Sequence, residues 1–231
     1  MIYLTGDTHG NFDRIEEFCE KSKTSKNDLM IILGDAGINF FGGRQDERCK
    51  ELLDSLPLSF LCIHGNHERR PNTIISYREA EFCGGTVYVE DNYPSIYFAK
   101  DGEIYDLDGY KCMAIGGAYS IDKPIRLVRG HGWWADEQPS EEIKARVMKR
   151  LESVNFKLDA VFSHTIPRKY EPVETYLAGI DEATVDKSTE DWLDSIEDKL
   201  DYKKWYCGHY HIEKDIDKVS VLFKTYKELM K

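Results

Sequence analysis

The chain repeats one local pattern five times: a short apolar run followed closely by polar side chains. The apolar runs cover residues 2–4, 29–33, 60–63, 160–162 and 205–207. A continuous apolar run of this kind indicates a strand that is buried on both faces, as in the sheet of an α/β protein. The repetition therefore predicts polar groups at the ends of buried strands, where α/β sheets gather their ligands.

The rest of the pattern predicts helices between these strands and a meander in the middle of the chain. Apolar residues at helical spacing predict one helix after Asn11 and others over residues 44–55, 140–154 and about 188–200. The last of these helices starts with a sequence that resembles a capping box. Strands are predicted over residues 86–89, 95–100, 103–107 and 110–115.

Turns and irregular segments complete the predicted organisation. Asp101 and Gly102 are typical of a hairpin turn between two of the meander strands. Residues 116–139 and 166–187 lack strong periodicity, and we expect these long loops to form the walls of a substrate pocket. The tail, residues 215–226, fits either a short strand pair or a helix. No repeat or linker interrupts the pattern, so residues 1–231 are expected to form one domain.

Composition and charge narrow the choice of partners and compartment. Hydrophobic residues make up 41% of the chain and charged residues 32%, as in an ordinary soluble globular protein. The formal net charge of −11, without a large Lys/Arg cluster, disfavours nucleic acid as a partner. No apolar stretch is long enough to cross a membrane, and the lack of a leader before the first strand predicts a cytoplasmic protein. The six cysteines form no CxxC pair, so neither a disulfide framework nor a zinc knuckle is expected.

The polar segments after the five strands contain the side chains of a metal site suited to phosphoester chemistry. They are Gly6-Asp7-Thr8-His9-Gly10, Gly34-Asp35-Ala36-Gly37, Gly65-Asn66-His67-Glu68, Ser163-His164-Thr165 and Gly208-His209-Tyr210-His211. Carboxylates, an amide oxygen and neutral imidazoles are ligands for a pair of divalent cations, which can share a hydroxide and clamp phosphoryl oxygens. Because bound cations reverse the local charge, an acidic protein can still hold a phosphate there.

These five blocks, in this order, resemble the signature of the calcineurin-like metallophosphoesterase superfamily. The resemblance implies an α/β (α+β) fold, a four-layer sandwich of two mixed β-sheets flanked by helices. It implies one cation held by Asp7, His9, Asp35 and His211, and a second held by Asp35, Asn66, His164 and His209, so that Asp35 bridges the two. His67 would be the catalytic histidine, which is not a ligand and assists the leaving oxygen.

The chain departs from the protein Ser/Thr phosphatase branch of that superfamily. Ile38 stands where that branch has the Asp that orients its catalytic histidine, and Asn39 stands where it has a phosphate-binding Arg. The metal ligands are complete, but specificity for phosphoproteins is not implied. The orienting partner of His67 is left open between Glu68 and a residue of a distant loop.

Four further residues are candidates for contacts with the substrate. Arg69 and Arg70 could bind the phosphate, and a solvated loop is the alternative. Trp133 and Trp134 could stack on an aromatic or sugar group of the substrate, and packing in the core or at an edge is the alternative. The residue types alone do not separate these interpretations.

The sequence therefore predicts a phosphoric ester hydrolase with two divalent metal ions. Mn²⁺ is expected first, and Fe, Zn²⁺ or Ni²⁺ also suit this ligand set. The implied reaction is attack on a phosphomonoester or phosphodiester by a hydroxide that bridges the metals. The expected substrate is a small phosphorylated molecule, with a nucleotide as one candidate. The alternatives are a nuclease or cyclic-nucleotide phosphodiesterase, and a non-catalytic scaffold of the same fold. The sequence makes no prediction of oligomeric state.

Overall fold

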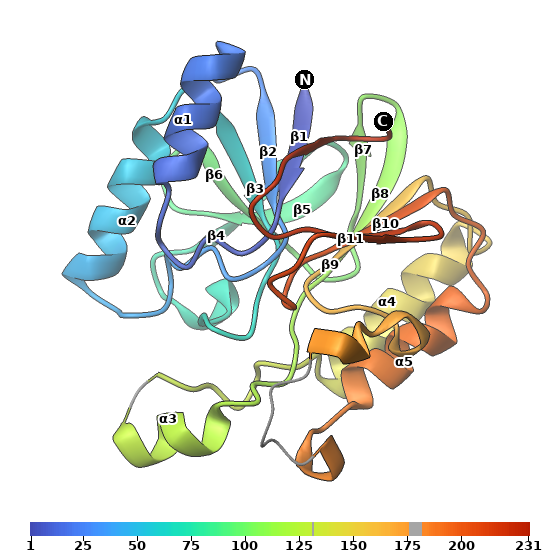
Figure 1. Ribbon diagram of the computed structural model, residues 1–231. Helices are drawn as coiled ribbons and strands as arrows, with labels where there is room; N and C mark the ends of the chain where they lie inside the picture. The colour runs from blue at the N-terminus through green and yellow to red at the C-terminus, as the bar shows by residue number, and fades with distance from the viewer. Residues whose placement is uncertain (131, 176–181) are drawn as a thin grey trace.

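Two mixed β-sheets face each other in the computed structural model, which describes residues 1–130, 132–175 and 182–231 (Figure 1). His131 and residues 176–181 of the predicted loops lie outside the described residues. The seven-stranded sheet has the order β13-β1-β2-β3-β6-β5-β4, and the six-stranded sheet has the order β11-β12-β10-β9-β8-β7. The strands are β1 (Ile2–Thr5), β2 (Leu29–Ile32), β3 (Ser59–Cys62), β4 (Arg78–Phe82), β5 (Gly85–Val89), β6 (Ile96–Ala99), β7 (Ile104–Leu107), β8 (Tyr110–Ile115), β9 (Ala160–Ser163), β10 (Lys204–Cys207), β11 (Lys214–Ile216), β12 (Val219–Val221) and β13 (Lys227–Glu228).

Helices cover the outer face of each sheet, so the predicted four-layer sandwich is confirmed (Figure 1). Helices α1 (Asp13–Ser22) and α2 (Arg44–Ser55) pack on the seven-stranded sheet. Helices α4 (Glu141–Ser153) and α5 (Ser188–Glu197) pack on the six-stranded sheet. Among the described residues, no helix has the length and apolar character needed to cross a membrane.

The largest apolar cluster lies between the two sheets and explains why the strands are apolar on both faces. Leu4, Ile31 and Leu61 of the seven-stranded sheet belong to the same buried cluster as Ala114 and Phe162 of the six-stranded sheet. The opposite faces of the same strands bury their side chains under the helices. Burial on both faces is what a continuous apolar run predicts, and alternation would have predicted only one covered face.

Parallel pairing brings the functional ends of the strands to one edge. Strands β1, β2 and β3 are parallel neighbours in register, with Ile2 opposite Leu29 and Leu29 opposite Ser59. In the other sheet, β9 and β10 are parallel neighbours. The carboxyl ends of parallel strands lie at the same edge of a sheet, so the polar segments that follow them come together.

The predicted hairpin at Asp101 and Gly102 is wrong. Strand β6 belongs to the seven-stranded sheet and β7 to the six-stranded sheet, so this turn carries the chain from one sheet to the other. The Asp101 carboxylate accepts the Gly116 N–H at 2.6 Å and forms an ion pair with Arg70 at 2.5 Å, which holds the turn between the sheets. The hairpin of this region is instead β7–β8, around Gly109. Local turn chemistry predicts a turn, but tertiary contacts decide which strands it joins.

Several local predictions also differ from the structure. Strand β4 was not predicted, because its sequence Arg-Glu-Ala-Glu-Phe is that of a charged edge strand without an apolar run. Helix α3 (Lys123–Arg129) lies inside a segment predicted to be irregular, and it projects from the layers (Figure 1). The capping box at the start of α5 is not formed, since its N-cap is Lys187 without a side-chain cap bond. The undecided tail, residues 215–226, forms the strand pair β11–β12, and β13 follows it. Short 3-10 turns lie at Pro71–Thr73, Arg168–Tyr170, Val173–Thr175 and Glu182–Thr184.

We expect Asp101→Asn to lower the free energy of unfolding by about 3–5 kcal/mol, because it leaves the buried guanidinium of Arg70 without its counterion. The side chains of this ion pair are only 7% and 5% exposed. Urea unfolding followed by circular dichroism measures the change. Asp91→Asn is the control, because its ion pair with Arg78 is largely exposed, and it should cost less than about 1 kcal/mol. Equal losses in the two variants would contradict this account of the turn.

Candidate metal centre

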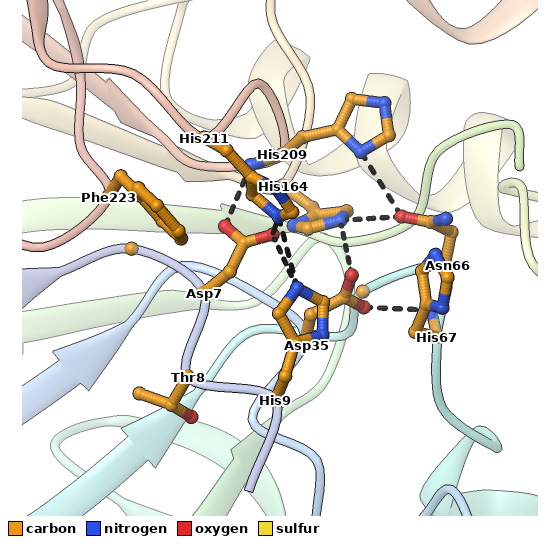
Figure 2. Close-up of polar contacts among 12 residues, drawn as sticks. Asp7, Thr8, His9, Asp35, Asn66, His67, His164, His209, His211 and Phe223 are labelled. Carbon is orange, nitrogen blue, oxygen red and sulfur yellow. Dashed lines mark hydrogen bonds and ion pairs between the residues drawn. The ribbon is translucent and has the colours of Figure 1, made fainter. Parts of the chain in front are cut away.

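The structure brings together the side chains of all seven predicted metal ligands at the edge where the two sheets meet (Figure 2). The seven-stranded sheet supplies four of them after β1, β2 and β3, and the six-stranded sheet supplies three after β9 and β10. The former are Asp7, His9, Asp35 and Asn66, and the latter are His164, His209 and His211. Residues far apart in the sequence therefore form one polar cluster.

The two buried carboxylates are held in the same way. Asp7 Oδ1 accepts the main-chain N–H of His209 at 2.8 Å, and Asp35 Oδ1 accepts the main-chain N–H of His67 at 2.8 Å. Each carboxylate then presents its second oxygen to the imidazoles. Asp7 Oδ2 lies 3.2 Å from His211 Nε2, and Asp35 Oδ2 lies 3.6 Å from His164 Nε2. One oxygen therefore fixes the carboxylate, and the other is available as a ligand.

Two glycines allow this close approach of the main chain to the carboxylates. A Cβ atom on Gly65 would lie 2.0 Å from Asp35 Oδ1, and a Cβ atom on Gly208 would lie 2.4 Å from Asp7 Oδ1. Neither position can accept a side chain without moving the carboxylate. The glycines that begin the third and fifth blocks are thus required by the geometry of the site.

The first group of ligands consists of Asp7, His9 and His211. The Nε2 atoms of His9 and His211 lie 3.0 Å apart, and His9 Nε2 lies 3.8 Å from Asp7 Oδ2. The ring of His211 stacks on Phe223 at 4.6 Å between centroids, which fixes its plane. Two ring nitrogens and a carboxylate oxygen that converge in this way are an arrangement that one cation could satisfy.

The second group is centred on the Asn66 amide oxygen. It lies 2.8 Å from His164 Nε2 and 3.1 Å from His209 Nδ1. The Asn66 amide nitrogen donates to Ser120 Oγ at 2.9 Å, so the amide oxygen faces the imidazoles. The ring of His164 is oriented by a 2.8 Å contact between its Nδ1 and the main-chain oxygen of Leu33. With Asp35 nearby, this group has the oxygen and nitrogen donors of a second divalent site.

The electrostatics of the cluster are those of buried carboxylates that need positive partners. Burial alone would raise the pKa of Asp7, but its bond to His211 and the charge of His164 lower it. The pKa of Asp35 is lowered as well. Burial would raise it, and the charge of His164 is the largest of the causes that lower it. Burial opposes a charge on His164, yet Asp35 raises the pKa of that imidazole to about 9. Burial and then His164 lower the pKa of His209 to about 3. A bound cation would replace the proton on His164 as the counterion of Asp35.

Backbone conformation also marks this region. His9, Asp35, His209 and His211 have φ values of 49°, 49°, 67° and 53°, in the left-handed region that non-glycine residues rarely adopt. Such conformations cost about 1–3 kcal/mol each and persist where the surroundings impose them. Four of the seven ligand residues share this feature, which is typical of a binding site.

A cavity of about 400 Å³ opens beside the ligands. It is lined by Asp35, Asn66, His67, His209 and His211 at the metal end, and by residues from both predicted loops. His67 lies beside His9, with 5.6 Å between ring centroids. The His67 Nε2 atom is 3.9 Å from Asp122 Oδ1. Sequence analysis missed Asp122, because an Asp just before the Lys-Pro start of α3 indicates only a helix cap.

The four other candidate residues do not line this cavity. Arg70 forms the buried ion pair with Asp101, and Arg69 donates to the main-chain oxygen of Thr73 at 3.2 Å. Trp133 donates to Glu137 Oε2 at 2.7 Å. The ring centroids of Trp134 and Phe40 lie 5.7 Å apart. Each side chain is thus occupied in contacts within the protein.

The sequence matches a family model, and the fold matches solved structures. Residues 1–213 match the family model described as calcineurin-like phosphoesterase. Solved structures similar to this chain include TT1561 of Thermus thermophilus, with a TM-score of 0.53 and 12% identity over 96% of this chain and 87% of that chain. They also include phosphopantetheinyl hydrolase (PptH) from Mycobacterium tuberculosis, with a TM-score of 0.51 and 14% identity over 96% of this chain and 87% of that chain. At these identities the likeness concerns the fold. No curated protein matches the sequence significantly.

We expect the purified protein, loaded with Mn²⁺ and then dialysed, to retain two metal ions per chain, because the ligands form two adjoining groups. Asp35→Asn removes the carboxylate between them and should lower the content to one ion or none. Inductively coupled plasma mass spectrometry measures the content, and thermal unfolding should show that Mn²⁺ stabilises the wild type more than the variant. Asp91→Asn, outside the site, should retain both ions. A wild type that holds one ion or none would contradict the two-site assignment.

Proposed function

The chain belongs to the calcineurin-like phosphoesterase family, and we propose that it hydrolyses a small phosphoester at a centre of two divalent metal ions. Family membership supports a metal-dependent phosphoester hydrolase in general. The convergence of seven ligand side chains beside a cavity is the observation that carries the proposal for this chain. None of the side chains that the resemblance requires as ligands is missing, which favours an enzyme over a scaffold.

The protein side chains have distinct tasks in this proposal. When bound, two divalent cations supply Lewis acidity and an activated water beside the phosphoryl group. Asp7, Asp35 and Asn66 provide oxygen ligands, and the four imidazoles provide nitrogen ligands. Mn²⁺ is the proposed metal, because this mixture of hard oxygens and imidazoles suits it. His67 lines the cavity beside the ligands, where it can donate a hydrogen bond or proton to the leaving oxygen.

We further assign Asp122 as the residue that positions His67. Its Oδ1 atom is buried, lies 3.9 Å from His67 Nε2 and accepts no hydrogen bond from the described residues. The same oxygen lies 3.7 Å from Arg126 Nη1, so this ion pair holds the carboxylate on the side of His67. Asp122 is the N-cap residue of α3, yet its side chain makes no capping bond. The other candidate, Glu68, accepts the Gly65 N–H with Oε1 at 2.9 Å, and none of the described hydrogen bonds or ion pairs joins its side chain to that of His67. Buried Ile38 cannot supply a carboxylate.

Activity is expected on simple aryl phosphoesters. Metal-loaded wild type should hydrolyse para-nitrophenyl phosphate or bis-para-nitrophenyl phosphate, and Asp35→Asn should lose this activity. His67→Ala should lower kcat by about 10²–10⁴-fold while keeping both metals, because it removes only the acid or hydrogen-bond donor. Steady-state kinetics and metal analysis on the same samples separate the two effects. If the protein held two metals but cleaved neither ester nor any of a panel of nucleotides, a scaffold would be the better interpretation.

Asp122→Asn should lower kcat by about 10–100-fold with little change in KM, because it loosens the orientation of His67 without removing a protein contact to the phosphate of the substrate. The loss should be greater for alkyl esters than for para-nitrophenyl esters, since the former need more help at the leaving oxygen. The double variant with His67→Ala should be no slower than His67→Ala alone. Asp136→Asn, from the same loop, is the control. Additive losses in the double variant would refute the positioning role.

A further inference from the structure

The cavity beyond the metal ligands has a wall of its own, distinct from the residues that hold the metals. Apart from the metal end, it is lined by Tyr119, Ile121, Asp122, Thr175, Val185, Asp186, Lys187, Glu190 and Tyr210. These residues come from the two loop segments, from α5 and from the turn after β10. Since the phosphate would bind at the metals, this wall must face the leaving group of the substrate.

The wall is poorly suited to a second anionic group. It contains three carboxylates, those of Asp122, Asp186 and Glu190, and one amine, that of Lys187. Lys187 Nζ lies 2.7 Å from Glu171 Oε1, and Asp122 Oδ1 lies 3.7 Å from Arg126 Nη1, so these two charges are already paired. Asp186 and Glu190 remain and make the wall negative. No arginine is among the described lining residues. A leaving group with a phosphate or carboxylate would be repelled here.

Glu190 offers a specific acceptor to the leaving group. Its side chain is buried, and Oε1 accepts the hydroxyl of Thr165 at 2.7 Å. The other oxygen, Oε2, has no hydrogen-bond partner among the described residues. A buried carboxylate oxygen without a donor is costly, and a donor from a ligand would remove that cost. Burial raises the pKa of Glu190 to about 7, because the charged carboxylate is poorly solvated there.

The other wall residues agree with a positively charged ligand. Both carboxylate oxygens of Asp186 already accept hydrogen bonds, from Ser188 N and Gln138 Nε2. Asp186 therefore contributes negative charge to the wall, and Glu190 is the carboxylate that would contact the ligand directly. Tyr119 and Tyr210 add two aromatic rings, whose faces attract cations. Lys123 Nζ lies 5.7 Å from the ring centroid of Tyr119, so that ring already has a cation beside it and adds less to the recognition of a second one. Carboxylates combined with aromatic rings form a common environment for ammonium groups.

We propose that the substrate is the phosphoester of an amino alcohol, with its cationic nitrogen at Glu190 and without a second anionic group. This inference rests on the proposed function and names the leaving group of that reaction. Water cleaves the P–O bond, the phosphorus gains the hydroxyl, and the leaving oxygen takes the proton. The free amino alcohol is released, and no other reactant is needed. Ile121 and Val185 would contact its carbon atoms.

Three aryl phosphates whose para substituents carry a positive, no and a negative charge test the proposal: 4-(aminomethyl)phenyl, 4-(hydroxymethyl)phenyl and 4-(carboxymethyl)phenyl phosphate. The aminomethyl and hydroxymethyl groups have the same number of heavy atoms, so this pair isolates the effect of charge. The methylene group keeps the acidity of the three phenols similar, so differences report on the cavity wall. With Mn²⁺-loaded wild type, kcat/KM should fall in that order, by about tenfold or more from the cationic to the anionic ester. Glu190→Gln should reduce the advantage of the cationic over the neutral ester several-fold, and Asp91→Asn should leave it unchanged.

The outcomes separate this inference from the function on which it rests. If all three esters were hydrolysed equally, or the anionic ester fastest, the amino-alcohol proposal would be overturned while phosphoesterase activity stood. If none were hydrolysed, nor bis-para-nitrophenyl phosphate, both proposals would fall. The wild-type series decides the question even if Glu190→Gln does not fold, which circular dichroism would show. A charge preference that persists undiminished in folded Glu190→Gln would overturn the role of Glu190.

Discussion

The functional end of the molecule depends on two buried carboxylates that accept hydrogen bonds from the main chain of other motifs. The bond from His209 N to Asp7 joins the two sheets, and the bond from His67 N to Asp35 joins the segments after β2 and β3. Burying two like charges side by side is unfavourable unless cations or imidazoles neutralise them. The contacts that assemble the site therefore also create its need for metal, so metal binding and the local stability of this edge are coupled.

The same constraint explains what the sequence could predict. A ligand at the end of a buried strand leaves a local trace, because the strand is continuously apolar and the following turn is short and polar. All five such segments were found from the pattern, and the division of the strands into two sheets was implied only by the resemblance to a family. The resemblance to a family then supplied the grouping of ligands, which spacing alone did not give. The convergence of the seven side chains follows from parallel pairing of β1, β2 and β3, and of β9 and β10.

What the sequence could not predict depends on contacts between distant residues. The turn at Asp101 looks like a hairpin, and only the ion pair with Arg70 and the bond from Gly116 show that it joins two sheets. Strand β4 exists because β5 offers it an edge, and its own residues are mostly charged. Asp122 resembles a helix cap, and only the fold places it near His67. In each case the decisive partner is remote, and no local pattern records it.

In the proposed function, the loop that contains Asp122 would serve both catalysis and recognition. In this chain, buried Ile38 stands where the protein Ser/Thr phosphatase branch has the Asp that orients its catalytic histidine. The carboxylate proposed to orient His67 comes instead from the start of α3, beside Tyr119 and Ile121 of the cavity wall. A leaving group that contacts this wall would also contact the segment proposed to position His67. Recognition of the correct leaving group could then improve the alignment of the catalytic imidazole, which would favour substrates by kcat as well as by binding.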